Sequence, residues 1–281
     1  MAFRRWFARR KRESHAGHWP IKPGSERPPE GWNGWPNGHR FAFVLTHDVD
    51  SQKGLDRVKQ LAELEMALGF RSSFNLIPEG PYRVEEGLRH WLTGHGFEVG
   101  VHDLNHDGKL YLSEKGFEIR AQRINHYLKE WNAVGFRSGF MHHNLKWLLA
   151  LDALYDASTF DTDPFEPQPD GVNTIFPFRV RREDRRDGYV ELPYTLPQDS
   201  TLFVLFKEKT NQIWERKLDW IVERGGMALL NAHPDYMSFD GLGMNDDEFP
   251  AALYEKFLRH VKEKYAGSYW HALPREVARF V

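Results

Sequence analysis

The sequence contains no cysteine. This absence excludes a disulfide framework, a thiolate metal site and a cysteine nucleophile, so any metal has to be bound by histidines and carboxylates. The chain also lacks an apolar run of the roughly 18 residues that a membrane span needs, and its first residues contain no apolar stretch of signal-peptide length. We therefore expect a cytoplasmic protein that is not exported by a standard secretory signal.

An excess of charge of one sign is also missing, since 38 basic residues face 40 acidic ones. This balance argues against a nucleic-acid partner. Residues 3–12 are a local exception, because they hold six basic side chains with aromatics between them. Such a segment can lie on an anionic membrane surface, and peripheral membrane contact is one prediction. The alternative is a solvated, frayed terminus, and we favour it from sequence alone.

The order of apolar and polar segments predicts one large α/β domain. Residues 1–40 combine the basic start with an irregular arm rich in Pro, Gly and Trp, which regular structure disfavours. Residues 41–281 alternate short apolar runs with longer amphipathic ones, as βα units do, apart from an insertion around 161–200. Strands are expected at 41–46, 72–77, 97–101, 135–139, 157–160 and 227–231. Helices are expected at 54–68, 85–94, 113–132, 145–154, 212–224 and 248–264.

Functional side chains of α/β folds gather where strands end, and two carboxylates follow the first predicted strand. Asp48 and Asp50 are on alternate residues, so a strand would point them the same way. Two such carboxylates can divide their roles, with one binding a cation and the other accepting a proton. The plainer alternative is that an Asp after a strand forms a turn or caps a helix.

His102 and His106 follow the third predicted strand. Over one helical turn this spacing brings two imidazoles to one side, where both can reach a metal ion. With one carboxylate they form a set that leaves coordination positions open for water and substrate. A chain with 14 histidines also produces some such pairs by chance.

Two further strand ends carry single polar residues. Arg137 can hold a carboxylate in its ionised form and orient it. His233 can act as a general acid. Taken one at a time, a surface salt bridge and a loop histidine are the simpler interpretations.

In this order the strand ends resemble the motifs of the polysaccharide deacetylase family, carbohydrate esterase family four, which has a NodB-type homology domain. The family's first motif, a strand before Thr-Phe-Asp-Asp, is similar to residues 45–50 here. His102 and His106 match its second motif, and His233 before a proline matches its fifth. The third is matched at Arg137 and Phe140, with Ser-Gly in place of the usual middle, and the fourth loosely by residues 156–161.

The resemblance implies a distorted (β/α) barrel of about seven strands and metal-dependent hydrolysis of a C–N amide bond, most simply N-deacetylation of an acetylated amino sugar in a glycan. It implies one divalent ion, Zn²⁺ first, with Co²⁺, Ni²⁺ or Fe²⁺ as alternatives. The implied metal ligands are Asp50, His102 and His106. Asp48, held by Arg137, would be the general base. The other implied roles are proton donation to the leaving amine by His233 and oxyanion stabilisation by backbone N–H groups near Phe140.

Three other functions stay open. The same scaffold can carry a hydrolase of a cyclic amide or ureide, whose product contains no acetate. A second alternative is an inactive saccharide-binding protein that kept the fold. The third is an iron oxygenase, because two histidines and a carboxylate also suit Fe²⁺ and residues 233–235 have His-x-Asp spacing. The βα pattern argues against this last alternative.

Overall fold

Strands and helices alternate through most of the chain. The computed structural model describes residues 2–182, 188–241 and 244–281. The strands of the main sheet are β1 (Phe41–Val49), β2 (Ser73–Leu76), β3 (Glu98–His102), β4 (Gly135–Arg137), β5 (Tyr155–Asp156), β6 (Phe178–Arg181), β7 (Gly188–Glu191), β8 (Met227–Ala232) and β11 (Tyr269–His271). Two short strands pair separately, β9 (Met237–Ser238) and β10 (Phe249–Pro250). The α-helices are α1 (Ala2–Ser14), α2 (Gln52–Leu68), α3 (Glu86–Gly94), α4 (Glu114–Glu130), α5 (Gln212–Arg224), α6 (Ala251–Lys264) and α7 (Pro274–Phe280).

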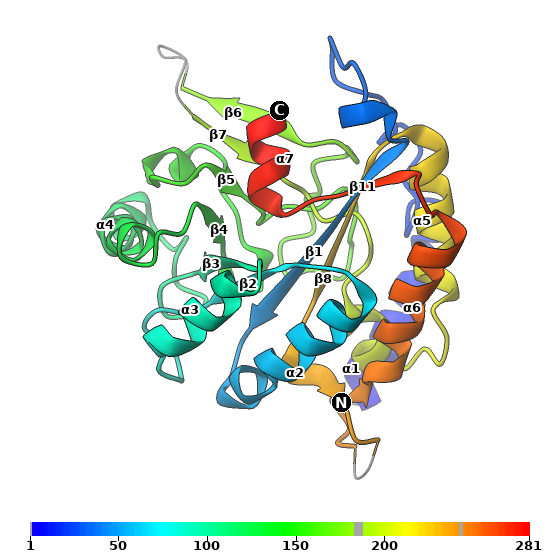
Figure 1. Cartoon of the computed structure of the whole chain (residues 1–281), viewed down its shortest axis with the longest axis horizontal. Coiled ribbons are helices and arrows are strands. Elements are labelled where there is room, and N and C mark those ends of the chain that lie inside the picture. Colours follow the sequence, from blue (N-terminus) through cyan, green and yellow to red (C-terminus); the bar gives the residue numbers. More distant parts are fainter. Residues whose placement is uncertain (1, 183–187, 242–243) are drawn as a thin grey trace.

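The main sheet has nine strands in the order β11-β1-β2-β3-β4-β5-β7-β6, and β8 pairs with β1 along residues 42–47. All pairings are parallel except that of β6 with β7. Figure 1 shows helices α2 to α6 around the outside of these strands. Parallel strands covered by helices are the mark of α/β folds, and the predicted fold class is confirmed. The expected number of about seven strands was low.

Isolated bridges connect the segment after β7 to the rest of the sheet. Tyr194 pairs with Phe160, and Leu196 pairs with Leu230 of β8. The sheet therefore curls, because β8 pairs with β1 and the segment after β7 returns to pair with β8. The result is the distorted barrel that the family resemblance implied.

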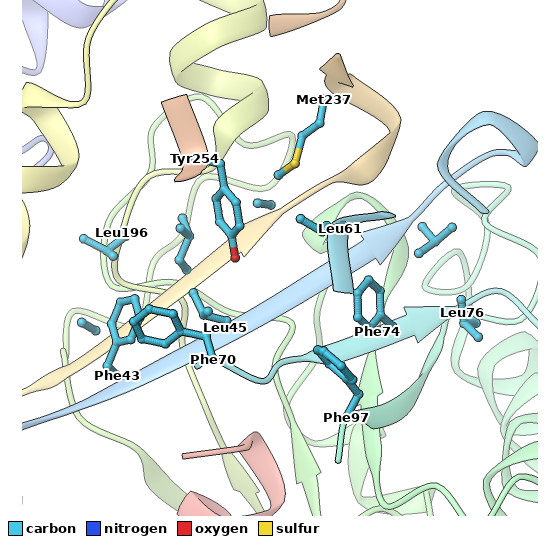
Figure 2. Packing of buried hydrophobic residues seen from close by; sticks show 14 of the residues in the cluster. Phe43, Leu45, Leu61, Phe70, Phe74, Leu76, Phe97, Leu196, Met237 and Tyr254 are labelled. Carbon is cyan, nitrogen blue, oxygen red and sulfur yellow. The ribbon is translucent and has the colours of Figure 1, made fainter. Parts of the chain in front are cut away.

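Alternate residues of β1 pack into two different cores, as the two-residue period of a strand requires. Phe43 and Leu45 belong to the layer between the sheet and the outer helices, and Figure 2 shows them with Phe70 and Leu61. Val44 belongs to a second cluster on the other face of the strand. Each of these large apolar side chains contributes about 1.5–3 kcal/mol when it is fully buried.

This alternation decides which polar residues of β1 reach the site. His47 faces the outer layer, where its Nε2 lies 2.7 Å from Glu65 Oε1 and its Nδ1 lies 3.0 Å from the Ala232 carbonyl oxygen. Ser72 donates a 2.6 Å hydrogen bond to the other oxygen of Glu65. His47 therefore has a structural place in the core, whereas Asp48 points to the opposite face.

Two elements differ from their prediction. The expected helix over residues 145–154 is only a short 3-10 turn, η3 (Trp147–Ala150). Asn125 of α4 explains this, because its side chain donates to the Ala150 carbonyl at 3.0 Å and accepts from Asp152 N at 2.8 Å. These bonds use backbone groups that a longer helix would need. The strand expected at 157–160 lies two residues earlier, as β5.

The insertion around 161–200 contains the antiparallel pair β6–β7, and its residues 183–187 lie outside the described part of the chain. It runs into a six-residue π-helix, η4 (Ser200–Leu205). The N-terminal residues also differ from expectation. Where we favoured a frayed terminus, residues 2–14 form helix α1. Trp35 anchors the following arm, because its Nε1 donates a 2.8 Å hydrogen bond to the Gly225 carbonyl.

Candidate metal-binding active site

The carboxyl ends of the parallel strands meet at one edge of the sheet, and the predicted site residues lie together there. One cavity of about 440 Å³ is lined by six of them, namely Asp48, Asp50, His102, His106, Phe140 and His233. The seventh, Arg137, is fully buried behind the cavity, with its Nη1 3.5 Å from Asp48 Oδ2. Residues up to 185 positions apart in sequence thus share one site, since the strands that carry them are neighbours in the sheet.

Asp50, His102 and His106 fit a metal ion by their geometry. Asp50 Oδ1 lies 3.3 Å from His102 Nε2 and 3.6 Å from His106 Nε2. The three ligand atoms all lie within 4.8 Å of one another. Ligands about 2.0–2.2 Å from a tetrahedral Zn²⁺ are separated by roughly 3.3–3.6 Å, so these spacings suit such an ion.

The hydrogen bonds around the three ligands support this fit. Asp50 Oδ1 is buried and has no hydrogen-bond partner among the described residues. An orphaned buried carboxylate oxygen is costly unless a cation meets it. His102 Nδ1 lies 3.0 Å from the Arg137 carbonyl oxygen, so Nδ1 carries the proton and Nε2 presents its lone pair to the site.

The electrostatic environments of the three candidate ligands differ. Burial and the neighbouring His102 lower the pKa of His106, which favours a neutral imidazole. Burial raises the pKa of Asp50, but the nearby imidazoles of His102, His233 and His106 outweigh burial, and the net shift is downward. Burial lowers the pKa of His102, whereas the anions Asp48 and Asp50 raise it more.

The loop that carries His106 is not the helical turn that the spacing predicted, and this expectation was wrong. His102 ends β3, and Asp103 and His106 both have φ of 54°. Two left-handed residues reverse the backbone sharply and bring the imidazole rings to a centroid distance of 4.9 Å. Gly139 makes room for this loop, since a Cβ there would lie 2.8 Å from His106 Cδ2 and 2.8 Å from Asp103 Oδ2.

Asp48 is held as an anion beside the candidate metal ligands. Asn75 Nδ2 donates to its Oδ1 at 2.8 Å, and Asn231 Nδ2 donates to its Oδ2 at 2.8 Å. Burial raises the pKa of Asp48, but the charge of Arg137, with smaller contributions from two histidines, holds that pKa far below its usual range. Asp48 is therefore ionised at any physiological pH.

His233 faces Asp48 across the site, with its Nε2 4.0 Å from Asp48 Oδ2. Its Nδ1 lies 2.7 Å from Asp199 Oδ1, and its backbone N donates to Asp199 Oδ2 at 2.8 Å. Burial lowers the pKa of His233, but Asp199 and the other carboxylates outweigh burial and raise it to about 10. His233 is thus a cation whose free nitrogen faces the cavity, as a proton donor requires.

Asp199 was missed by the sequence reasoning, because it follows no strand. It caps η4 by accepting a 2.8 Å hydrogen bond from Ser200 N. One signal was present in the sequence. Asp199 is the only charged residue between positions 192 and 206, and a lone charge in an apolar segment is expected to have a buried partner.

Glu166 was also missed, and it forms part of another wall of the cavity. Its Oε1 accepts hydrogen bonds from Tyr194 Oη at 2.7 Å and Gln198 Nε2 at 2.6 Å. Burial raises the pKa of Glu166 to about 8, so this carboxyl is a neutral acid at pH 7. Phe140 completes the site with φ of 57°, and its ring stacks on His106 at a centroid distance of 4.5 Å.

Asp235, which gave the His-x-Asp spacing with His233, does not join the candidate metal ligands. Its Oδ2 accepts a 3.0 Å hydrogen bond from Asp50 N, and its Oδ1 accepts a bond from the Ser51 hydroxyl. Gly54 approaches so closely that a Cβ there would overlap the Asp235 carboxylate. Asp235 therefore fixes the backbone of Asp50 in place, and residues 233–235 are not the ligand set of an iron oxygenase.

Comparison with known proteins identifies the fold. No family model and no curated protein matches the chain. A protein assigned as a polysaccharide deacetylase from Mycobacterium smegmatis is 19% identical with a TM-score of 0.66, and the match covers 90% of this chain and 94% of that one. The Puue allantoinase is 13% identical with a TM-score of 0.62, over 90% and 93% of the two chains.

A third similar structure is a mutant of a carbohydrate esterase family four pseudoenzyme with restored enzymatic activity. It is 13% identical with a TM-score of 0.50, over 87% of this chain and 69% of that one. At these identities the similarity defines the fold, which is the NodB-type distorted barrel of polysaccharide deacetylases. The resemblance inferred from the strand ends is confirmed at this level.

Proposed function

We propose that this protein is a metal-dependent hydrolase of a C–N amide bond that removes the acetyl group from an acetylated amino sugar. One observation carries the proposal. A carboxylate held as an anion, Asp48, and a histidine held as a cation, His233, face each other beside the possible metal ligands. A base and an acid on two sides of one site are what amide hydrolysis needs, since water must lose a proton and the leaving amine must gain one.

Asp50, His102 and His106 would hold the divalent ion, Zn²⁺ first and Co²⁺, Ni²⁺ or Fe²⁺ as alternatives. The chemistry that such an ion supplies is Lewis acidity toward the amide carbonyl and toward a water molecule. The residues of the chain do the rest. Asp48 accepts the proton of the attacking water, and Arg137 keeps Asp48 ionised and oriented.

His233 then donates the proton from Nε2 to the leaving nitrogen, while Asp199 keeps its Nδ1 side fixed. Backbone N–H groups near Phe140 would stabilise the oxyanion that forms on the carbonyl oxygen. One proton thus passes from water to Asp48 and one from His233 to the leaving nitrogen. The products are a free amine and acetate.

The test is acetate release from N-acetylated amino-sugar oligosaccharides by the metal-loaded protein. Asp48→Asn keeps the shape of the side chain and removes its basicity, so turnover should fall by about 10²–10⁴-fold. Asp152→Asn is a matched control, because Asp152 is exposed and is not one of the residues that line the cavity. Equal activity of the two variants would mean that a residue other than Asp48 is the general base.

A second candidate is a hydrolase that opens a cyclic ureide or amide. The structural similarity to an allantoinase, with a TM-score of 0.62, supports this second candidate. The products separate the candidates, since ring opening releases no acetate. Ring opening of allantoin, with no acetate from any oligosaccharide, would favour this function. Tight saccharide binding without turnover under several divalent metals would favour an inactive binding protein.

A further inference from the structure

Helix α1 presents an outward face made of aromatic and basic side chains. At 3.6 residues per turn, Trp6, Phe7, Arg10 and Lys11 fall within one side of the helix. All four are exposed, with 46% of Trp6 and 55% of Phe7 accessible to solvent. Large aromatics at this level of exposure are unusual unless something covers them.

The inward face holds the helix on the body of the protein. Ala8 is buried, and Arg5 Nη2 lies 2.8 Å from Asp246 Oδ2. Arg12 Nη1 lies 2.5 Å from Glu208 Oε1, and the Arg12 guanidinium lies 5.6 Å from the centre of the Trp19 ring. The helix is thus fixed by one side, and its opposite side is presented to the surroundings.

The outward cations have no acidic partner in the described part of the chain. Neither Arg10 nor Lys11 forms an ion pair within residues 2–182, 188–241 and 244–281, and Arg10 instead lies 4.3 Å above the Trp6 ring. The one acidic residue of α1, Glu13, follows Trp6 by seven positions, so it lies about 20° from Trp6 at the edge of this face, and Arg10 and Lys11 leave the face net positive. The face therefore combines exposed aromatic surface with positive charge, which complements an anionic and partly apolar partner.

The outward face also borders a groove that leads to the candidate active site. Together with Phe165 and Leu205 it lines a hollow of about 710 Å³. Phe165 and Leu205 line the active-site cavity as well. The groove and the cavity are therefore neighbours, and whatever covers α1 lies beside the mouth of the site.

We propose that α1 docks the protein on an anionic lipid surface. Trp6 and Phe7 would enter the headgroup layer, with Arg10 and Lys11 against the lipid phosphates, as interfacial helices do. None of the helices in the described part of the chain has the length and apolar character to cross a membrane, so the contact would be peripheral. Docking in this way holds the mouth of the cavity at the membrane surface.

The test is co-sedimentation of the full chain with vesicles, which requires no turnover and does not depend on the proposed hydrolysis. We expect binding to vesicles of phosphatidylcholine mixed with phosphatidylglycerol and none to pure phosphatidylcholine. The binding should weaken when salt shortens the Debye length from about 10 Å at 0.1 M to about 3 Å at 1 M. No binding to the anionic vesicles at low salt would overturn the proposal.

Variants of the outward face test whether vesicle binding depends on α1. Each cation near an anionic surface changes partitioning by about fivefold. Arg10→Glu with Lys11→Glu should therefore weaken vesicle binding by well over tenfold, and Trp6→Ser with Phe7→Ser should also weaken it. The matched control is Arg216→Glu with Arg279→Glu, the same charge change at exposed residues of α5 and α7.

Circular dichroism and the unfolding temperature of each variant show whether the fold is kept, and exposed positions predict little change. Equal loss in the α1 pair and the control pair would mean that only net charge matters, and it would overturn the assignment to α1. Binding to duplex DNA that depends on Arg10 and Lys11, without vesicle binding, would also overturn it.

Discussion

Asp199 Oδ1 lies 2.7 Å from Nδ1 of His233, and this buried pair decides the charge of the histidine. Asp199 comes from the start of η4, and His233 follows β8. The pair orients the imidazole so that Nε2 faces the cavity, where a leaving group would take its proton. Asp199, which follows no strand, thus sets the acidity of His233, which lies at the end of β8.

Asp199→Asn should lower the pH above which the enzyme loses activity. The pKa of His233 is raised to about 10, so the wild-type histidine stays protonated below that pH and becomes neutral above it. Removing the Asp199 charge lowers this pKa and moves the alkaline limit of kcat toward neutral pH. The measurement is a pH profile of kcat for both proteins. An unchanged alkaline limit would mean that another group donates the proton.

Arg137→Met should destabilise the protein by about 3–5 kcal/mol, because it leaves the buried carboxylate of Asp48 without its cation. The cost should be smaller in an Asp48→Asn background, where that charge is absent. Urea unfolding of the four proteins in this double-mutant cycle gives the coupling. Equal cost in both backgrounds would show that Arg137 acts through packing alone.

Gly139→Ala should weaken metal binding by about 10–100-fold, the usual effect of disturbing a residue that orients a ligand. The new methyl group would meet the His106 ring at 2.8 Å and push it out of position. Gly87→Ala in α3 is the control, since a Cβ there meets nothing within 4 Å. Titration with Zn²⁺ measures both, and equal affinities would place His106 outside the ligand set.

Glu98 should make the fold less stable as the pH rises toward neutrality. Burial raises the pKa of Glu98 to about 7 from the ordinary 4.5, so the folded protein holds a proton that the unfolded chain releases. This stabilisation is complete below about pH 4.5 and is lost as pH rises through 7, up to about 3 kcal/mol.

Glu98→Gln should therefore flatten the dependence of the free energy of unfolding on pH between about 5 and 8. Part of the slope should remain, since burial also raises the pKa of Asp163 to about 7 and that of Glu166 to about 8. Urea unfolding at several pH values measures this slope. A slope equal to that of the wild type would mean that Glu98 is ionised in the fold.

Much of the fold was predictable because its central strands are apolar runs that end in polar residues. β1, β3 and β8 were predicted within three residues of their observed ends. Parallel strands bring such ends to one edge, and for that reason Asp50, His102 and His233 were predicted as neighbours. The site emerged from sequence because its residues lie where the local pattern changes.

The remaining features depend on contacts that no local pattern contains. Asp199 reaches the site from a π-helix, and the helix expected over residues 145–154 stops because Asn125 binds its backbone. The pair of histidines was predicted for the wrong reason, since positive φ at Asp103 and His106 replaces the expected helical turn. Helix α1 forms where a frayed end was expected, and its ion pairs with Asp246 and Glu208 hold it in place.

Elemental analysis of the purified protein tests the central claim most directly, beside a His102→Ala, His106→Ala double variant and the Asp48→Asn variant. If Asp50 and the two histidines hold an ion, the wild type and Asp48→Asn contain about one divalent metal per chain, and the double variant contains none. Wild-type protein that holds no metal after incubation with Zn²⁺ would contradict the account.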